Sequence, residues 1–314
     1  MSTVTVLGGG RSCEHEVSLA SARSVARGLR TAGFAVLELT IGLDGRWYED
    51  GAPLGASVAS SLAAALHRAE GSVWFPVLHG PDGEDGTLAA LSRLHGSPLV
   101  GSGVGAGAIA MDKWTTKLVA RAVGVATAPG VVVRRGEPVP RWTGAAVVKP
   151  VAAGSSHGVS LVADPTELPA ALGAALGLDD RALVEEVVHG REIDVAVLRR
   201  ADGTLLVAPA LEILGDGIFD TATKYDGSAR FQVPADLDPD LADRLEAAAV
   251  RVFEALGCAG VARVDFFVTA TGDLVLNEVN TMPGMTEHSQ VPRMFAAAGC
   301  SYASLLGELV RAAA

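Results

Sequence analysis

The first hundred residues alternate between short apolar runs and longer segments with helical spacing. Val4 to Leu7 is an apolar run that ends at three glycines, and Glu16 to Leu29 places apolar residues at helical intervals. Phe34 to Ile41 alternates between apolar and polar positions, which is typical of a strand. This strand–helix–strand order favours a parallel α/β unit with a right-handed crossover. An N-terminal parallel α/β domain is therefore expected over residues 1–101, completed by strands at 72–78 and 98–100 and a helix at 87–94.

The pattern beyond this domain predicts two α+β units. The small residues 101–107 are typical of a hinge or linker. A central unit is expected over residues 102–189, with helices at 111–123 and 165–176 and strands at 130–133, 145–148, 159–162 and 182–188. A C-terminal unit is expected over residues 190–314, with strands at 193–198 and 205–211, a polar loop at 215–234 and helices at 239–256 and 302–311.

Two apolar strands near the C-terminus also carry polar side chains at alternating positions. A two-residue turn at Thr271-Gly272 predicts a hairpin in which Asp265 lies opposite Glu278. The same register places Arg263 opposite Asn280. Side chains alternate between the faces of a strand, so these four polar groups share one face. Directly opposed residues have Cβ atoms about 5 Å apart, which brings the two carboxylates into mutual repulsion.

A bound cation would remove this repulsion. Asp, Glu and Asn side chains supply the hard oxygen ligands that Mg²⁺ prefers. Arg263 beside them could hold a phosphate or a developing oxyanion. A solvated, salt-bridged surface would use the same residues, so the hairpin alone leaves both interpretations open. Its strongly apolar neighbours, such as Val264 and Phe266, argue against an ordinary edge hairpin.

Composition narrows the function classes. A formal charge of −11 and a pI near 5.1 argue against general affinity for nucleic acid or an anionic membrane. Local Lys and Arg must therefore hold any anionic ligand. Cys13, Cys258 and Cys300 lack the spacing of metal ligands and indicate a reduced compartment. With no secretory leader pattern and no apolar run of ~20 residues, we expect a soluble cytoplasmic protein.

Several polar residues at the ends of predicted strands are further candidates. Glu14 follows the first strand and could bind an ammonium group, or simply oppose a helix macrodipole. His79 ends another strand at the same edge, where α/β proteins bind ligands, and is structural or catalytic. Lys149 ends the strand 145–148 and precedes the Gly-Ser-Ser loop at 154–156. Glycine-rich backbone with adjacent hydroxyls and a lysine can bind phosphate.

Two acidic residues and a polar loop complete the set. Glu185 and Glu192 flank the end of the strand 182–188, where carboxylates could accept hydrogen bonds from adenine or ribose. For these two residues alone, a charged strand end is the stronger interpretation. The loop 215–234 contains Lys224-Tyr225, and a loop of this length in a folded domain is usually functional or disordered.

In combination, these segments resemble the D-alanine–D-alanine ligase family. The resemblance runs in order over nearly the whole chain and implies the ATP-grasp fold, a three-domain α/β and α+β architecture with an N-terminal parallel α/β domain. The matching segments are Gly9–Ser18, Leu78–Thr87, Gly101–Val104, Met111–Lys113, Lys149-Pro150, Gly154–Ser156, Lys224-Tyr225 and Asn277–Thr286.

The resemblance implies roles for residues that bind ATP and metal. Two lysines would contact the ATP phosphates, and a loop serine would lie beside them. Three residues of the adenine segment would hold the base and ribose, and three oxygen donors would hold two Mg²⁺ ions, with Mn²⁺ as a substitute. These residues are Lys113, Lys149 and Ser156 for phosphate, Glu185, Val188 and Glu192 for adenosine, and Asp265, Glu278 and Asn280 for metal.

The resemblance also implies a site for two small D-amino acids. Arg263 and the backbone at Gly284 would stabilise the tetrahedral oxyanion. Glu14 would bind the first ammonium group, oriented through Ser155 and Tyr225. The second carboxylate would face Lys224 and Ser289, and His79, Val17 and Gln290 would line the substrates. A homodimer is a further expectation from the family.

The chain departs from the family pattern at four places. His157 follows Gly-Ser-Ser, Glu186-Val187-Val188 occupies the adenine segment, Gln290 follows Ser289, and Asp82 replaces a common aromatic residue. These departures bear on the second substrate more than on the reaction. The main hypothesis is an ATP-dependent ligase that joins two D-alanines through an acyl phosphate for peptidoglycan precursors. The alternatives are a paralogous carboxylate–amine ligase with another second amino acid, and a nucleotide-binding regulator without catalysis.

Overall fold

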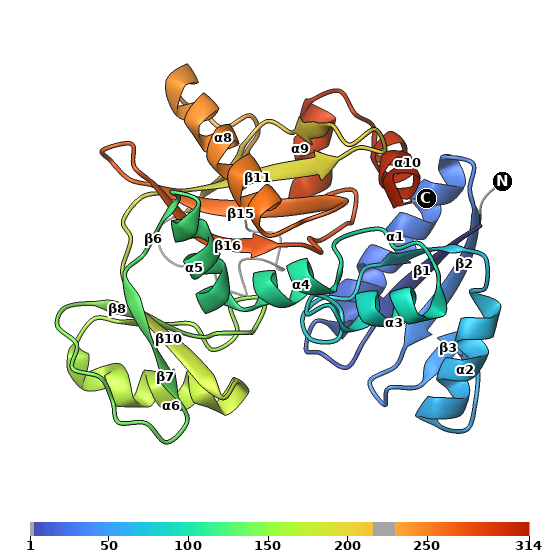
Figure 1. Ribbon diagram of the computed structural model, residues 1–314, viewed down its shortest axis with the longest axis horizontal. Coiled ribbons are helices and arrows are strands. Elements are labelled where there is room, and N and C mark those ends of the chain that lie inside the picture. Colours follow the sequence, from blue (N-terminus) through green and yellow to red (C-terminus); the bar gives the residue numbers. More distant parts are fainter. Residues whose placement is uncertain (1–2, 216–229, 314) are drawn as a thin grey trace.

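The described part of the chain, residues 3–215 and 230–313 of a computed structural model, forms three β-sheets (Figure 1). The first sheet has the strand order β4-β3-β2-β1-β5, in which β1 pairs in parallel with β2 and β5. This parallel core agrees with the strand–helix–strand pattern of the sequence. Its elements are β1 (Thr3–Gly9), α1 (His15–Thr31), β2 (Ala35–Ile41), β3 (Trp47–Glu49), β4 (Ala52–Pro53), α2 (Val58–Arg68), β5 (Val73–Pro76) and α3 (Thr87–His95).

The second sheet is antiparallel, with the order β7-β10-β8-β9, and α6 covers it. Apolar side chains of the strands and of α6 form one buried cluster that includes Val148, Leu172 and Val184. The elements are β7 (Gly130–Arg134), β8 (Ala146–Pro150), β9 (Ser160–Val162), the 3-10 helix η1 (Pro165–Glu167), α6 (Leu168–Leu178) and β10 (Arg181–Glu186).

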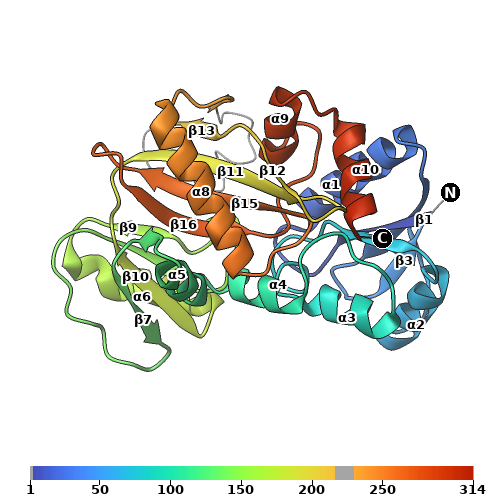
Figure 2. The same cartoon turned by 45° about the horizontal axis from the view of Figure 1, so that its top comes forward.

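The third sheet carries the predicted hairpin. Its order is β14-β13-β11-β15-β16-β6, with β12 paired to β11. Helix α8 lies across one face (Figure 2), where Phe253 packs in the same buried cluster as Val264 and Phe266. The elements are β6 (Ala126–Thr127), β11 (Arg191–Arg199), β12 (Leu205–Val207), β13 (Leu211–Leu214), β14 (Arg230–Gln232), α8 (Pro239–Ala255), β15 (Val261–Val268) and β16 (Leu274–Asn280).

The last two helices, α9 (Gln290–Ala297) and α10 (Tyr302–Ala313), join this sheet to the first domain. Helix α10 lies beside α1 in both views (Figures 1 and 2). The two helices approach closely at Gly28, where an added Cβ would lie 2.5 Å from Leu306 Cδ1 and 2.8 Å from Tyr302 Cε1. Side chains of α1, α9 and α10 therefore share one buried cluster.

The predicted linker is mostly a helix. Residues 104–111 form α4 (Val104–Met111), and α5 (Lys113–Ala122) follows directly after Asp112, which caps it by accepting a hydrogen bond from the Thr115 N–H at 2.8 Å. The single helix predicted over 111–123 is thus wrong at its start. Glycine serves close packing here, because a Cβ at Gly107 would lie 2.8 Å from the carbonyl oxygen of Glu84. The small residues that predicted a linker therefore belong largely to a closely packed helix.

The hairpin register is confirmed at the polar residues, but the predicted turn is wrong. Thr269 pairs with Asp273 through hydrogen bonds, so the loop contains three residues and Gly272 takes a positive φ of 78°. A shift of one residue between Asp265 and Phe266 compensates. Phe266 pairs with Leu276, whereas Asp265 still pairs with Glu278, which leaves Asn277 as the extra residue of a bulge.

Two further boundaries differ from the sequence expectations. The predicted strand 182–188 ends at Glu186, so Val188 lies beyond β10. The predicted strand 205–211 is two separate strands, β12 and β13. Within the polar region 215–234, β14 covers Arg230–Gln232.

Candidate functional site

Three carboxylates lie in one row across the third sheet. Asp194 on β11 pairs with Asp265 on β15, which pairs with Glu278 on β16. Paired residues share a face of the sheet, so the three acids project together. In the next row, Arg263 lies between Ala196 and Asn280. The sequence predicted four of these polar residues and missed Asp194.

The guanidinium of Arg263 offsets part of the negative charge of this row. It donates to both oxygens of Asp265, from Nε at 2.7 Å and from Nη2 at 2.6 Å. Its Nε also lies 3.4 Å from Asp194 Oδ2, and its Nη1 donates to Gln290 Oε1 at 2.7 Å. Burial alone would lower the pKa of Arg263, but the carboxylates of Asp265 and Asp194 raise it well above its usual range. Arg263 is therefore a fixed, permanent cation.

Asp194 is the most deeply buried member of the row, with no solvent exposure. Its Oδ2 accepts a hydrogen bond from Gln290 Nε2 at 2.7 Å. Its Oδ1 has no hydrogen-bond partner among the described residues. Burial raises the pKa of Asp194 well above its usual range, and the charge of Asp265 raises it further.

The three predicted metal ligands offer two carboxylates and one side-chain amide oxygen. Asp265 and Glu278 lie opposite each other, and Asn280 Oδ1 accepts a hydrogen bond from the Met282 N–H at 2.8 Å. Within residues 3–215 and 230–313, no group of three His, Cys, Asp or Glu side chains has a metal-binding arrangement. Two carboxylates and an amide oxygen nevertheless suit Mg²⁺, which keeps several waters and takes further ligands from substrate phosphates.

A second cluster joins two lysines to one carboxylate. Lys149 Nζ lies 2.5 Å from Glu185 Oε1, and Lys117 Nζ donates to Glu185 Oε2. All three side chains are buried. Burial, the largest influence, would raise the pKa of Glu185, but the two ammonium groups outweigh it and lower that pKa. Burial lowers the pKa of Lys117.

The hairpin bulge connects this cluster to the carboxylate row. The extra residue, Asn277, accepts a hydrogen bond from Lys149 Nζ through Oδ1 at 3.4 Å. Lys113 Nζ lies 3.4 Å from Glu278 Oε2 and donates to the carbonyl of Ala153 at 2.7 Å. Two lysines from different elements thus face the hairpin, which favours a site for several negative charges.

The sequence analysis missed Lys117 and Asp194. Lys117 follows Lys113 by one helical turn on α5, so the spacing placed the two ammonium groups on neighbouring positions of one face. Asp194 follows Glu192 by two residues on β11, which puts both acids on one face. A charged residue inside the otherwise apolar stretch 193–198 was the available signal for Asp194.

The Gly-Ser-Ser loop reaches the N-terminal domain. Ser155 Oγ donates a hydrogen bond to Glu14 Oε1, and Glu14 is buried. Ser155 and Ser156 both adopt positive φ angles, 49° and 57°, which non-glycine residues rarely do. A Cβ at Gly154 would lie 2.7 Å from Glu14 Oε2, so glycine permits this approach. The loop backbone is held in an uncommon conformation that aims Ser155 at Glu14.

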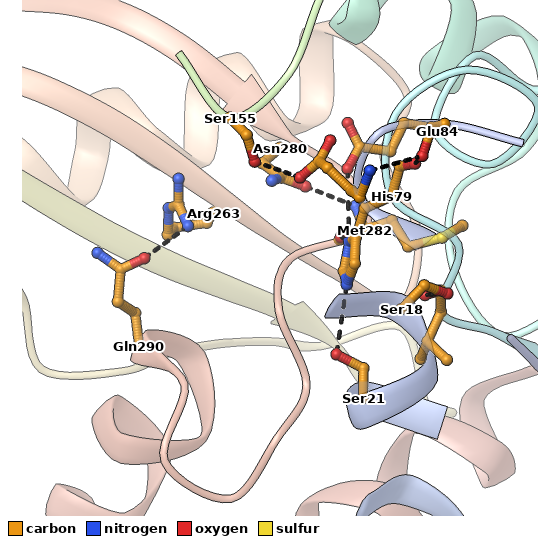
Figure 3. A network of polar contacts seen from close by, with 12 residues as sticks. Ser18, Ser21, His79, Glu84, Ser155, Arg263, Asn280, Met282 and Gln290 are labelled. Atoms are coloured by element: carbon orange, nitrogen blue, oxygen red, sulfur yellow. Dashed lines mark hydrogen bonds and ion pairs between the residues drawn. The ribbon is translucent and has the colours of Figure 1, made fainter. Parts of the chain in front are cut away.

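His79 joins the first domain to the turn after β16 (Figure 3). Its Nδ1 lies 3.1 Å from the carbonyl oxygen of Met282, which can only accept, so Nδ1 carries the proton. Its Nε2 lies 3.3 Å from Ser21 Oγ, and Glu84 Oε1 lies 3.7 Å from Nδ1. Burial, the largest influence, would lower the pKa of His79, but Glu84 and then Glu14 raise it above the ordinary value.

Two cavities of the protein share part of their lining. The first, of about 770 Å³, and the second, of about 640 Å³, have sizes typical of ligand sites. Lys113, Ala153, Arg263 and Glu278 line both of them. Those four residues therefore form the boundary across which a group could pass from one ligand to another.

The predicted site residues divide between the cavities according to their expected roles. The described residues expected to bind ATP line the first cavity: Lys113, Lys149, Ser156, Glu185, Val188 and Glu192. The described residues expected to bind or activate amino acids line the second: Glu14, Val17, His79, Ser155, Arg263, Gly284, Ser289 and Gln290. Of the metal candidates, Asp265 lines the first, Asn280 the second and Glu278 both. Lys224 and Tyr225 lie outside the described residues.

The residues at which the chain departs from the family pattern have specific surroundings. Asp82 forms an exposed ion pair with Arg11 at 2.9 Å, and His157 lines the first cavity. Gln290 starts α9 and directs both polar side-chain atoms at Arg263 and Asp194. Nothing in the sequence indicated that orientation.

Comparisons with known proteins identify a family. A family model for the D-Ala–D-Ala ligase N-terminus matches residues 3–65, and one for the C-terminus matches residues 139–311. The D-alanine–D-alanine ligase of Deinococcus radiodurans is 43% identical, covering 99% of this chain and 98% of that protein. The corresponding ligase of Mycolicibacterium smegmatis is 41% identical, covering 98% of this chain and 94% of that protein.

Solved structures give the same result. The VanG D-Ala:D-Ser ligase of Enterococcus faecalis matches with a TM-score of 0.84 and 33% identity, covering 100% of this chain and 99% of that chain. The D-alanine–D-alanine ligase of Coxiella burnetii also matches with a TM-score of 0.84, at 30% identity, covering 99% of this chain and 93% of that chain. Among the described residues, no helix is long and apolar enough to cross a membrane.

Proposed function

The chain belongs to the D-alanine–D-alanine ligase family, and on that premise we propose that it joins two D-alanines at the expense of ATP. The reaction would supply a dipeptide for peptidoglycan precursors. The observation that carries this proposal is the boundary between the two cavities. A cavity with lysines and a cavity with Glu14 share Arg263, Lys113 and Glu278 as their common wall.

In the first step, the γ-phosphoryl group of ATP moves to a carboxylate oxygen of the first D-alanine. The products are an acyl phosphate and ADP. Lys113 and Lys149 would neutralise the phosphate oxygens, and Glu185 holds Lys149 in place for this task. Each oxygen of Glu185 keeps a lone pair for the adenine amine, and Glu192 would accept from the ribose.

In the second step, the amine of the second D-alanine attacks the acyl carbon. The amine loses a proton, the carbon–oxygen bond to phosphate breaks, and inorganic phosphate leaves. Arg263 and the backbone at Gly284 would stabilise the oxyanion of the tetrahedral intermediate. The three oxygen donors Asp265, Glu278 and Asn280 would hold Mg²⁺, which supplies charge neutralisation at the phosphates when bound.

Glu14 and Ser155 orient the first substrate. The Glu14 carboxylate lies in the amino-acid cavity and is buried, so an ammonium group there would gain a strong, charge-assisted hydrogen bond. Ser155 fixes one of the two carboxylate oxygens. His79 would lie near the reacting carboxyl group, and its proximity to Glu84 favours the charged form there. Lys224 and Ser289 would face the second carboxylate.

The test is phosphate release from ATP with D-alanine and Mg²⁺, followed by mass spectrometry of the product. We expect stoichiometric ADP, phosphate and D-alanyl-D-alanine. The similar D-Ala:D-Ser ligase structure favours one second candidate, a ligase with another second amino acid. A panel of D-alanine paired with D-serine, D-lactate and other amino acids separates the two. No phosphate release with any pair would reject both.

The proposal also covers the domain boundaries, the cellular location and the oligomeric state. We place the domain boundaries at 101/102 and 189/190, with β6 of the central unit pairing with β16 in the third sheet. A cytoplasmic location fits the use of ATP, and a homodimer fits the family. Size-exclusion chromatography with light scattering tests the oligomeric state.

A further inference from the structure

Arg263 is held from two sides. Asp265 engages it through two short hydrogen bonds on one side. On the other side, Gln290 accepts from Nη1 at 2.7 Å. Asp194 Oδ2 lies 3.4 Å from Nε, the atom that also donates to Asp265. The Asp265 contacts lie within β15. Gln290 lies at the start of α9, and its side chain points toward Arg263 (Figure 3).

The orientation of the Gln290 amide follows from its two neighbours. Arg263 has only N–H donors, so the amide oxygen must face it. Asp194 Oδ2 lies 2.7 Å from the amide nitrogen and 3.4 Å from the donor Arg263 Nε, so this oxygen is an acceptor and the amide nitrogen must face it. If the amide were flipped, its N–H groups would face the N–H groups of Arg263, and its oxygen would face the oxygen of Asp194. Gln290 is therefore a bridge with a fixed direction, from Asp194 to Arg263.

Asp194 in turn anchors the bridge. It is fully buried in the central part of the sheet and pairs with Asp265 across the strands. An acceptor held this rigidly fixes the Gln290 amide, and the amide fixes one edge of the guanidinium. In a buried network, each group is held by the next, and removing one loosens the others.

We propose that Gln290 and Asp194 are positioning residues that hold the guanidinium of Arg263 at the boundary of the two cavities. Gln290 then affects turnover through Arg263, and does not select the second amino acid by touching it. This inference rests on the proposed function, because it assigns Arg263 to the oxyanion. A displacement of a stabilising donor by 1 Å is enough to lose much of its effect.

The first test is Gln290→Met, which keeps the length of the side chain and removes both hydrogen bonds. We expect kcat to fall about ten- to a hundredfold, because a hydrogen bond to a charged group is lost. The KM values for ATP and D-alanine should stay within about twofold, and the ranking of D-alanine, D-serine and D-lactate should not change. An unchanged kcat, or a new ranking with a raised KM, would overturn the proposal.

The second test reverses the bridge. Gln290→Glu alone faces a carboxylate toward Asp194 and should lose more activity than Gln290→Met. The double variant Gln290→Glu/Asp194→Asn keeps the total charge and exchanges donor and acceptor, so kcat should recover at least tenfold over Gln290→Glu. Absence of recovery in a folded double variant contradicts the bridge. Asp202→Asn, at an exposed turn after β11, is the matched control.

A third measurement does not depend on activity. In the ¹⁵N-labelled full chain, the Arg263 Nη1–H signal, assigned by its absence in Arg263→Lys, should exchange slowly with solvent, because Gln290 accepts this proton. Gln290→Met should accelerate that exchange at least tenfold. If the wild-type protein releases no phosphate, the proposed function fails, and the exchange rates still decide whether the bridge holds Arg263. Equal exchange in wild type and variant would refute it.

Discussion

Ser155 donates a hydrogen bond to Glu14 across 141 positions of sequence, and so links the Gly-Ser-Ser loop to the start of α1. Ser155→Ala removes this bond without adding bulk. We expect the KM for D-alanine to rise about tenfold, because the Glu14 carboxylate loses its orientation. ATP affinity should change little. Steady-state phosphate release measures both, and Ser304→Ala on the exposed surface of α10 is the control.

Gly154 tests the same contact from the backbone. In Gly154→Ala, the new Cβ would lie 2.7 Å from Glu14 Oε2, the mobile end of a side chain. The carboxylate should therefore move, raising the KM for D-alanine while the unfolding midpoint stays nearly constant. Gly173→Ala in α6 is the matched control, because nothing lies within 4 Å of its Cβ position. A large loss of stability in Gly154→Ala would contradict this interpretation.

Glu278 faces both Asp265 and Lys113, at the boundary of the cavities. Glu278→Gln removes one anionic ligand from the proposed magnesium site. The Mg²⁺ concentration for half-maximal activity should rise at least about tenfold. Titration of activity with MgCl₂ after chelation gives the value. Glu308→Gln, an exposed residue paired with Arg311, should leave the titration unchanged.

Glu185 balances Lys117 and Lys149, so its removal should cost more than the removal of one lysine. Glu185→Gln leaves two buried ammonium groups without a counter-charge and should destabilise the fold by about 3 kcal/mol. Lys117→Met keeps one matched pair and should cost less. The double variant should recover part of the loss, as measured by urea unfolding. Equal losses for both single variants would show that charge balance is not the cause.

His79 predicts a pH dependence of stability. Its folded pKa is raised above 6.5 by Glu84 and Glu14, despite burial. The resulting stabilisation is fully present below the unfolded pKa and is lost as pH rises through the folded pKa. The urea midpoint should therefore fall as the pH rises above about 6.5. Glu84→Gln should flatten this slope, and an equal slope in that variant would exclude the pair as its source.

The hairpin shows how much of the structure the local sequence pattern could predict. Alternation along β15 and β16 placed Asp265 opposite Glu278, because side-chain direction in a strand depends only on position. The loop length was misjudged, since Thr271-Gly272 fits a two-residue turn and gives no sign of the bulge at Asn277. The bulge compensated for the longer loop. At α4, small residues led to the wrong prediction of a linker, whereas Gly107 permits close packing of a helix.

The sequence by itself determined the order of the motifs and the family that they resemble, and this resemblance implied which residues would bind ATP and which the amino acids. The motifs can be read from the sequence because each consists of residue types at fixed spacings along a strand or loop. The tertiary structure decided what Lys117, Asp194 and Gln290 do. Their partners lie 68 positions away for Lys117 and Glu185, and 96 positions away for Asp194 and Gln290. Burial and charge balance between distant segments exist only after folding, so no local pattern could specify them.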